Sequence, residues 1–346
     1  MRKGYEGYDP NGVGVDNGNF LGLPIVDDPA ISFLSVPYDA TVSYSEGTAG
    51  GPANILAAST QLDVSIPGLD RPWELGFVWK GLSGTWLDQL AQTRTYVKDV
   101  ITTLEKGSPL SENQKSCLTH INRQGEALRQ TVFTAVKSEI DAGRLPVLVG
   151  GEHSISLGAF EAAATKGDFG ILQIDAHMDL RSSYEGFEFS HASVMYNAIN
   201  TIPQLSQLTQ VAIRDWCPAE EEVVHANPGR IAVFYDQDLS EAKLRGEAFA
   251  KTIQPIIATL PQRVWISFDI DGLDPSLCAH TGTPVPGGLS FAEAKFLCQA
   301  VLESGRTIIG LDLVEVAPAP HEYEGSVAAR LMYEIAARAV SANKKP

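Results

Sequence analysis

The chain has 346 residues, of which 44% are hydrophobic and 20% are charged. This balance excludes a disordered chain, and the sequence has no run of about 18 apolar residues that could span a membrane. Acidic residues outnumber basic residues by 42 to 26, and no long Lys/Arg cluster offers a surface to nucleic acid. We therefore expect a soluble globular protein with neither a nucleic-acid nor a membrane partner.

The N-terminal segment predicts an irregular arm and a cytoplasmic location. Arg2 and Lys3 are followed by polar and small residues instead of the apolar core of a signal peptide. Residues 1–30 are rich in Gly, Asn, Asp and Pro, so we expect an arm there and one domain over 31–346. The four cysteines form no CxxC pair, which indicates reduced thiols and no disulfide framework.

Short apolar runs alternate with longer amphipathic segments along the rest of the chain. The predicted strands are 31–36, 145–149, 169–174, 208–213, 231–235, 264–268 and 307–313. The segments with helical spacing are 88–105, 111–142, 241–259, 290–303 and 325–342. Two of these long helices interrupt the alternation, so we predict a helical excursion within 60–143. The pattern as a whole predicts an α/β fold whose parallel sheet has helices on both faces.

Residues of metal-ligand type follow three of the predicted strands, and parallel strands gather ligands at their carboxyl ends. Alternate side chains of an extended backbone point the same way, so closely spaced ligands can share one face. The segments that follow these strands are Gly150-Gly151-Glu152-His153-Ser154, Asp175-Ala176-His177-Met178-Asp179 and Asp269-Ile270-Asp271-Gly272.

Several carboxylates that converge at one edge of a sheet need compensating positive charge. Two divalent cations would supply it, and mixed imidazole and carboxylate ligands suit Mn²⁺, Ni²⁺ or Co²⁺. Each motif alone has an ordinary explanation as a turn, a helix cap or a buried structural histidine. A calcium loop does not fit because Leu273 stands at its fifth position and no Glu closes the frame. Three such strand ends together favour a two-metal site.

These motifs resemble those of the ureohydrolase superfamily, which contains arginases, agmatinases and formiminoglutamases. The segments 150–154, 175–179 and 267–275 are similar to its three metal-binding motifs, in the same order. Pro37-Tyr38-Asp39 and the segment 312–318 are similar to its first and last motif strands, so the resemblance covers about 31–340. It implies a three-layer α/β/α fold of the arginase type, assembled as a trimer or hexamer.

The resemblance also implies a ligand set and a reaction. One ion would be held by His153, Asp175, Asp179 and Asp269, and the other by His177, Asp175, Asp269 and Asp271. The ions would be Mn²⁺, with Ni²⁺ as the alternative. A hydroxide between them would attack a guanidinium carbon and release urea, or a urea derivative, and an amine. Glu315 would accept hydrogen bonds from the guanidinium, and His191 would carry protons to the leaving amine.

Arg181 and the segment 184–186 resemble agmatinases, whereas arginases have Asn at the position of Arg181. This similarity implies a small cationic guanidino substrate whose tail is an amine or a small uncharged group. Met178, Ala192 and the long 60–143 region depart from the agmatinase pattern, so a guanidino acid, free guanidine or an alkylated guanidine or biguanide stays open. Two readings of other classes also stay open. They are a non-catalytic metal-bound subunit that partners a homologous chain and a deacetylase-like site with one zinc ion.

Overall fold

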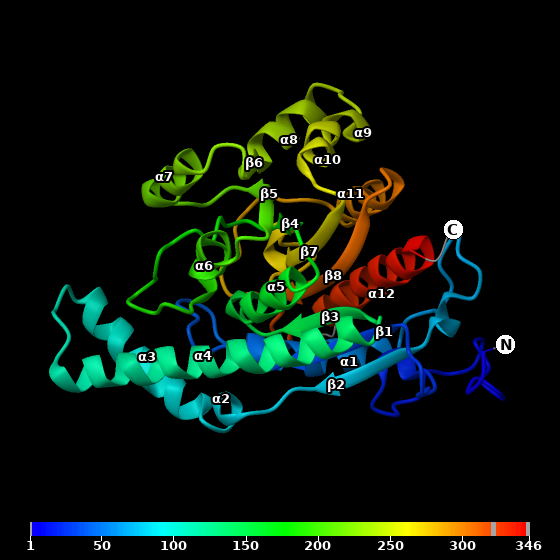
Figure 1. Cartoon of the computed structure of the whole chain (residues 1–346), viewed down its shortest axis with the longest axis horizontal. Helices are drawn as coiled ribbons and strands as arrows, with labels where there is room; N and C mark the ends of the chain where they lie inside the picture. The colour runs from blue at the N-terminus through cyan, green and yellow to red at the C-terminus, as the bar shows by residue number, and fades with distance from the viewer. Residues whose placement is uncertain (1, 320–322, 344–346) are drawn as a thin grey trace.

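A computed structural model describes residues 2–319 and 323–343, in which eight parallel strands form one sheet (Figure 1). The strand order is β2-β1-β3-β8-β7-β4-β5-β6. The strands are β1 (Ile31–Val36), β2 (Phe77–Gly81), β3 (Leu145–Gly150), β4 (Phe169–Ile174), β5 (Leu205–Ile213), β6 (Ile231–Tyr235), β7 (Arg263–Asp269) and β8 (Thr307–Val314). All seven predicted strands are present, and the predicted parallel sheet is confirmed.

The strand β2 was not predicted, and its place in the sheet explains why. It lies at the edge and pairs with β1 alone, through a register that aligns Phe77 with Ile31. Only the first of its five residues is fully buried. An edge strand can therefore carry a mixed sequence such as Phe-Val-Trp-Lys-Gly and lack the continuous apolar run that marks the central strands.

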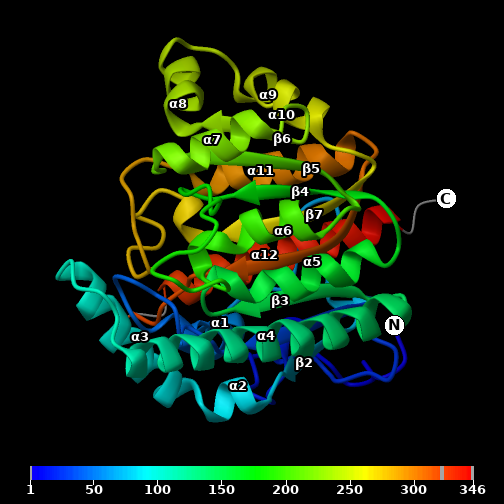
Figure 2. The same cartoon turned by 60° about the vertical axis from the view of Figure 1, so that its left-hand side comes forward.

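Helices cover both faces of the sheet, as the two views in Figures 1 and 2 show. On one face α1, α11 and α12 pack against β-strand residues such as Val147 and Leu172, and on the other α4, α5 and α6 pack against Leu148 and Ile171. The longer helices are α1 (Gly51–Ser59), α3 (Leu90–Glu105), α4 (Glu112–Asp141), α5 (Leu157–Ala164), α6 (Val194–Thr201), α7 (Pro218–Ala226), α8 (Asp236–Leu244), α11 (Phe291–Glu303) and α12 (Tyr323–Asn343). None of the helices within the described ranges is long and apolar enough to cross a membrane.

The single helix predicted over 241–259 is wrong. The chain instead forms α8, then the short helices α9 (Phe249–Thr252) and α10 (Gln254–Thr259). Gly246 adopts φ 82°, a left-handed conformation that interrupts the helix, and Pro255 lies in the first turn of α10. Apolar periodicity continues across these breaks, which is why the pattern alone predicted one element.

The N-terminal arm packs into the sheet's core although it has almost no regular structure. The Phe20 ring stacks on Phe33 of β1 with centroids 4.2 Å apart, and both side chains are fully buried.

On the opposite side of the molecule α3 and α4 form a helical hairpin that extends beyond the sheet (Figure 1). We call residues 90–141 the helical hairpin.

Candidate active site

The candidate site lies at the carboxyl ends of the four central strands β3, β8, β7 and β4, which are neighbours in that order. His153 follows β3, Asp175 follows β4, Asp269 ends β7 and Glu315 follows β8. Segments that are far apart in the sequence therefore meet at one edge of the sheet, as the strand-helix pattern predicted.

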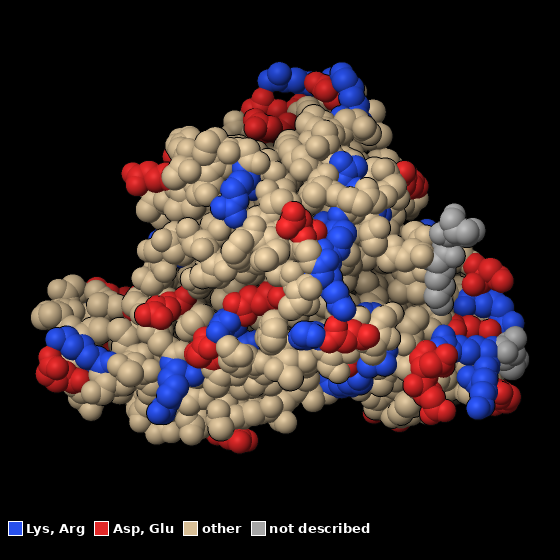
Figure 3. Space-filling model, in the orientation of Figure 1, with Lys and Arg blue, Asp and Glu red and all other residues tan. Residues whose placement is uncertain are grey.

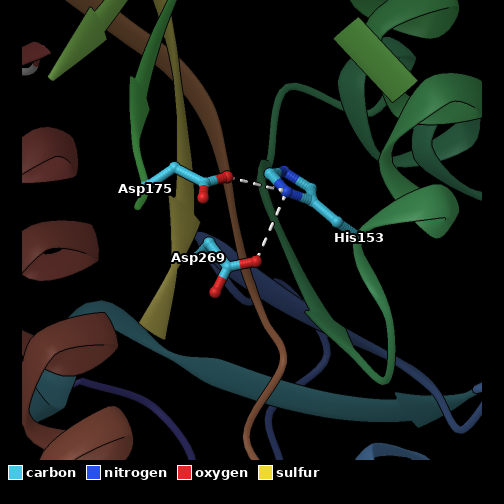
Figure 4. A group of neighbouring side chains, drawn as sticks. All are labelled: His153, Asp175 and Asp269. Carbon is cyan, nitrogen blue, oxygen red and sulfur yellow. Dashed lines mark ion pairs between the residues drawn. The ribbon is translucent and has the colours of Figure 1, made fainter. Parts of the chain in front are cut away.

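The His153 imidazole lies among three carboxylates. Its Nδ1 atom is 2.9 Å from Asp179 Oδ2, 3.2 Å from Asp175 Oδ2 and 3.5 Å from Asp269 Oδ2. Figure 4 shows Asp175 and Asp269 pointing towards the imidazole from neighbouring strands. All four side chains are buried, yet Nδ1 makes no hydrogen bond of acceptable geometry. The arrangement leaves an imidazole lone pair and carboxylate oxygens facing one common point.

A second group of ligand-type atoms shares Asp175 with the first. His177 Nδ1 lies 3.2 Å from Asp271 Oδ2 and 3.6 Å from Asp175 Oδ1. One ligand atom from each of Asp175, His177 and Asp271 lies within 4.8 Å of the others, as is also true of His153, Asp175 and Asp269. Asp175 is common to both groups, as a bridging ligand would be. Asp269 belongs to the first group only, so its bridging role stays a prediction.

The local backbone brings these ligands together differently from the extended segments that we expected. Asp271 lies in a 3-10 turn, and Asp179 adopts a left-handed conformation with φ 54°. Backbone donors then orient the carboxylates: His177 N–H donates to Asp175 Oδ1 at 2.7 Å, and Asp271 N–H donates to Asp269 Oδ1 at 3.0 Å. A left-handed non-glycine residue costs free energy, and such residues concentrate at functional sites.

The carboxylates at this site cannot all ionise without added positive charge. Burial and the charge of Asp175 raise the pKa of Asp179 to about 7, and burial with Asp271 raises the pKa of Asp269 well above its usual value. Burial disfavours the His153 imidazolium, but Asp175 and Asp179 raise its pKa well above the usual range. The protein alone must therefore retain protons here, and divalent cations bound by this donor set would replace them.

A pocket opens beside these ligands and contains the two other predicted site residues. Glu315 is buried in a left-handed conformation, and its Oε1 accepts the His153 N–H at 2.8 Å while Oε2 has no partner. Burial lowers the pKa of His191 to about 3, so this imidazole is neutral at neutral pH. Other side chains that line the pocket include Tyr44, Arg181, Tyr184, Asp215, Trp216 and Glu220.

A sequence model of the arginase family matches residues 29–338. The chain belongs to the arginase family. An N(1)-aminopropylagmatine ureohydrolase of Synechocystis sp. is 28% identical over 84% of this chain and 82% of its own length. An agmatinase of Bacillus anthracis is 29% identical over 85% of this chain and 86% of its own length. The crystal structure of an agmatine ureohydrolase of Thermoplasma volcanium matches with a TM-score of 0.66 and 26% identity, covering 90% of each chain.

These comparisons confirm the predicted superfamily and the arginase-like α/β/α fold. They also confirm the prediction of a metal-dependent hydrolase that cleaves a guanidino C–N bond in the manner of ureohydrolases. The ligand assignments and the roles of His191 and Glu315 remain predictions for this arginase-family chain.

The residues that orient the His153 ring through its Nε2 atom were not predicted from the sequence. His153 Nε2 lies 2.8 Å from Ser267 Oγ, which donates to Asp312 Oδ1 at 2.9 Å, and Trp265 Nε1 donates to Asp312 Oδ2 at 2.6 Å. Ser267 and Asp312 are register partners on β7 and β8. Polar side chains within otherwise apolar central strands were the signal that could have identified them. Such partners fix the orientation of a ligand histidine.

His191→Ala is expected to lower kcat by about 10²-fold or more while leaving bound metal unchanged, because the predicted role of this imidazole is proton transfer and it is not among the ligand groups. Steady-state kinetics and metal analysis of the same preparation measure both effects. The matched control is His225→Ala, since His225 is exposed on α7. A variant that lost its metal would show that His191 had been assigned the wrong role.

Glu185→Gln is expected to stabilise the protein above about pH 7 and to have little effect below about pH 4.5. Burial, with Glu105, raises the Glu185 pKa from 4.5 to about 7, and its Oε2 is buried without a partner. Between about pH 4.5 and 7 the unfolded chain releases a proton that the folded wild type retains, so wild-type stability falls as the pH rises through this window and the loss is complete above about pH 7. Melting temperatures of both proteins between pH 5 and 8 test the expectation. A difference in melting temperature that does not change with pH would refute it.

Proposed function

We propose that the chain hydrolyses a guanidino compound with a cationic amine tail, as an agmatinase does, and releases urea and an amine. One observation carries this proposal. Glu315 lines the same pocket as residues of the metal-ligand groups, and its buried Oε2 has no hydrogen-bond partner. A carboxylate in that position can accept hydrogen bonds from a planar guanidinium and hold its central carbon beside the ligand cluster.

Two divalent cations would be held by the ligand groups. His153, Asp175, Asp179 and Asp269 would hold one, and His177, Asp175, Asp269 and Asp271 the other. When bound, such ions lower the pKa of water and so provide a nucleophile at neutral pH. We propose Mn²⁺ as the metal and Ni²⁺ as the alternative, because the ligands are imidazole nitrogens and carboxylate oxygens.

The protein's own side chains would bind and orient the substrate. The His153 N–H fixes one oxygen of Glu315, so the other stays directed at the substrate guanidinium. His191, neutral and with Nδ1 unpartnered, can accept a proton within the pocket and pass it to the leaving amine.

The charged side chains that line the pocket favour a cationic tail. The Asp215 side chain is 65% exposed, and its Oδ2 lies 3.9 Å from His177 Nε2. Arg181 is less available to an anionic tail because it lies over the Tyr184 ring at 4.7 Å and 3.8 Å from Glu220. Figure 3 shows acidic and basic side chains interspersed on the face that it draws.

A screen of guanidino compounds tests the proposal. Metal-free protein is loaded separately with Mn²⁺ or Ni²⁺ and assayed for urea and amine release from agmatine, arginine, 4-guanidinobutyrate, guanidine and an alkylated guanidine. Agmatine is expected to give the highest kcat/KM. A preference for the guanidino acid would contradict the cationic tail but leave the reaction class. No urea from any compound with either metal would favour the non-catalytic subunit.

We also propose that the chain forms a trimer or hexamer and acts in the cytoplasm. Its four free cysteines suit a reducing compartment, and three of them are buried. Light scattering of the purified chain, alone and with any homologous subunit, would measure the assembly.

A further inference from the structure

Arg94 of α3 connects the helical hairpin to the loop after β1, which lines part of the active-site pocket. Its Nη1 donates to the carbonyl oxygens of Ala40 at 3.0 Å and Val42 at 2.6 Å. Its Nη2 pairs with Glu46 Oε1 at 2.9 Å. The guanidinium is largely buried, and Val42 belongs to the pocket lining. The rigid, planar guanidinium thus binds three residues of the loop that follows β1, namely Ala40, Val42 and Glu46.

Thr41 lies between Ala40 and Val42 in the sequence, and it contacts two segments that carry candidate site residues. Its N–H donates to Glu152 Oε2 and its hydroxyl donates to Glu152 Oε1, both at 2.7 Å. The same hydroxyl oxygen accepts the backbone N–H of His191 at 3.3 Å. Glu152 directly precedes His153. Thr41 therefore joins the segment that carries the candidate proton carrier to the segment that carries a candidate metal ligand.

The hairpin also contacts residues 187 and 188, which lie shortly before His191 in the sequence. The Phe187 side chain is fully buried in a cluster with Val97, Val100 and Ile121 of α3 and α4. The Glu188 N–H donates to Asn122 Oδ1 at 3.1 Å. Two of the segments that line the pocket, the loop after β1 and the segment that carries His191, are thus attached to the hairpin.

We propose that Arg94 is a positioning residue for the reaction, and that the helical hairpin serves to hold the pocket wall through it. By fixing the Ala40 and Val42 carbonyls, Arg94 places Thr41 where its hydroxyl sets the distance between His191 and the Glu152–His153 segment. The inference rests on the proposed function, because the positioned groups are those assigned to substrate turnover. Misplacement of such groups by about 1 Å can lower turnover 10²-fold.

The neighbouring Lys98 provides a matched control. It lies one helical turn after Arg94 and pairs with the same Glu46 oxygen at 2.8 Å, but it contacts neither carbonyl. Arg94→Met is expected to lower kcat by about 10- to 100-fold with metal content unchanged, whereas Lys98→Met should stay within about twofold of the wild type. Arg94→Lys, which keeps the charge, should recover part of the loss. Equal effects of Arg94→Met and Lys98→Met on kcat would show that Arg94 only attaches the hairpin to the loop, and would overturn the proposal.

A double-mutant cycle tests the route through Thr41. Thr41→Val removes the hydroxyl and keeps the volume, so it should also lower kcat. If Arg94 acts through Thr41, Arg94→Met should cost far less in the Thr41→Val background than in the wild type. Fully additive losses would contradict this route.

Hydrogen exchange supplies a measurement that does not depend on activity. In the full-length protein, Arg94→Met should speed exchange at 38–47 and at 184–192, and Lys98→Met should not. If the wild type hydrolyses no guanidino compound yet exchange changes as expected, the proposed function fails and the positioning by Arg94 stands. If the wild type is active and Arg94→Met changes neither exchange nor kcat, the inference fails and the proposed function stands.

Discussion

Asp269→Asn is expected to lower kcat/KM by about 10³-fold or more and to reduce bound metal, because it removes the charge of a predicted metal ligand. Asp269 is buried at the end of β7, and its Oδ2 lies 3.5 Å from His153 Nδ1. An asparagine oxygen can still accept the Asp271 N–H that Asp269 Oδ1 accepts at 3.0 Å, so the turn should persist. Kinetics and metal analysis of the purified variant measure both effects.

The same substitution should not destabilise the metal-free protein. Burial and the nearby Asp271 and Asp175 carboxylates raise the Asp269 pKa well above its usual value, so asparagine relieves repulsion when no cation is bound. Melting temperatures in chelator should therefore be equal to or higher than those of the wild type. Asp238→Asn, at an exposed position on α8, is the control and should change neither metal content nor activity. Full activity of Asp269→Asn would refute the two-metal site.

Glu315→Gln is expected to weaken guanidinium binding and to lower kcat/KM by about 10- to 100-fold, the equivalent of one charged hydrogen bond. The glutamine oxygen can replace Oε1 and keep the His153 N–H bond of 2.8 Å. Its amide nitrogen then takes the place of the unpartnered Oε2 and presents donors to a substrate that is itself a donor. The substrate loses its acceptor while the metal ligands stay intact.

Steady-state kinetics with a guanidino substrate, together with metal analysis, measure this effect. Glu324→Gln is a matched control because Glu324, on α12, is also a buried glutamate but does not line the pocket. Its Oε1 lies 2.7 Å from His280 Nδ1. It should leave kcat/KM unchanged. Unaltered kinetics in Glu315→Gln would remove Glu315 from substrate binding.

The central strands and the ligand-bearing segments could be predicted from the sequence because each is a local pattern. A fully buried strand such as β4 is a continuous apolar run, and Asp175 and His177 follow it immediately. The topology then places such strand ends together whatever the conformation of each turn. This is why the ligands converge although the backbone at Asp179 and Asp271 is not extended.

Features that depend on distant contacts could not be predicted in the same way. Thr41 bonds to Glu152 and to His191 across separations of 111 and 150 residues, and nothing about a threonine near β1 indicates either contact. The neutral state of His191 depends on burial, which its neighbours in the sequence do not reveal. Arg94 lies on a helix whose pattern indicates only that one face is apolar.

The most direct test of a metal-dependent guanidino hydrolase is a metal titration followed by urea release. Metal-free protein is supplied with increasing Mn²⁺ in the presence of agmatine, and urea is measured at each step. We predict no urea from the metal-free chain and a rate that rises to a plateau at about two ions per chain. Urea release without metal, or a plateau at one ion, would contradict the two-metal site.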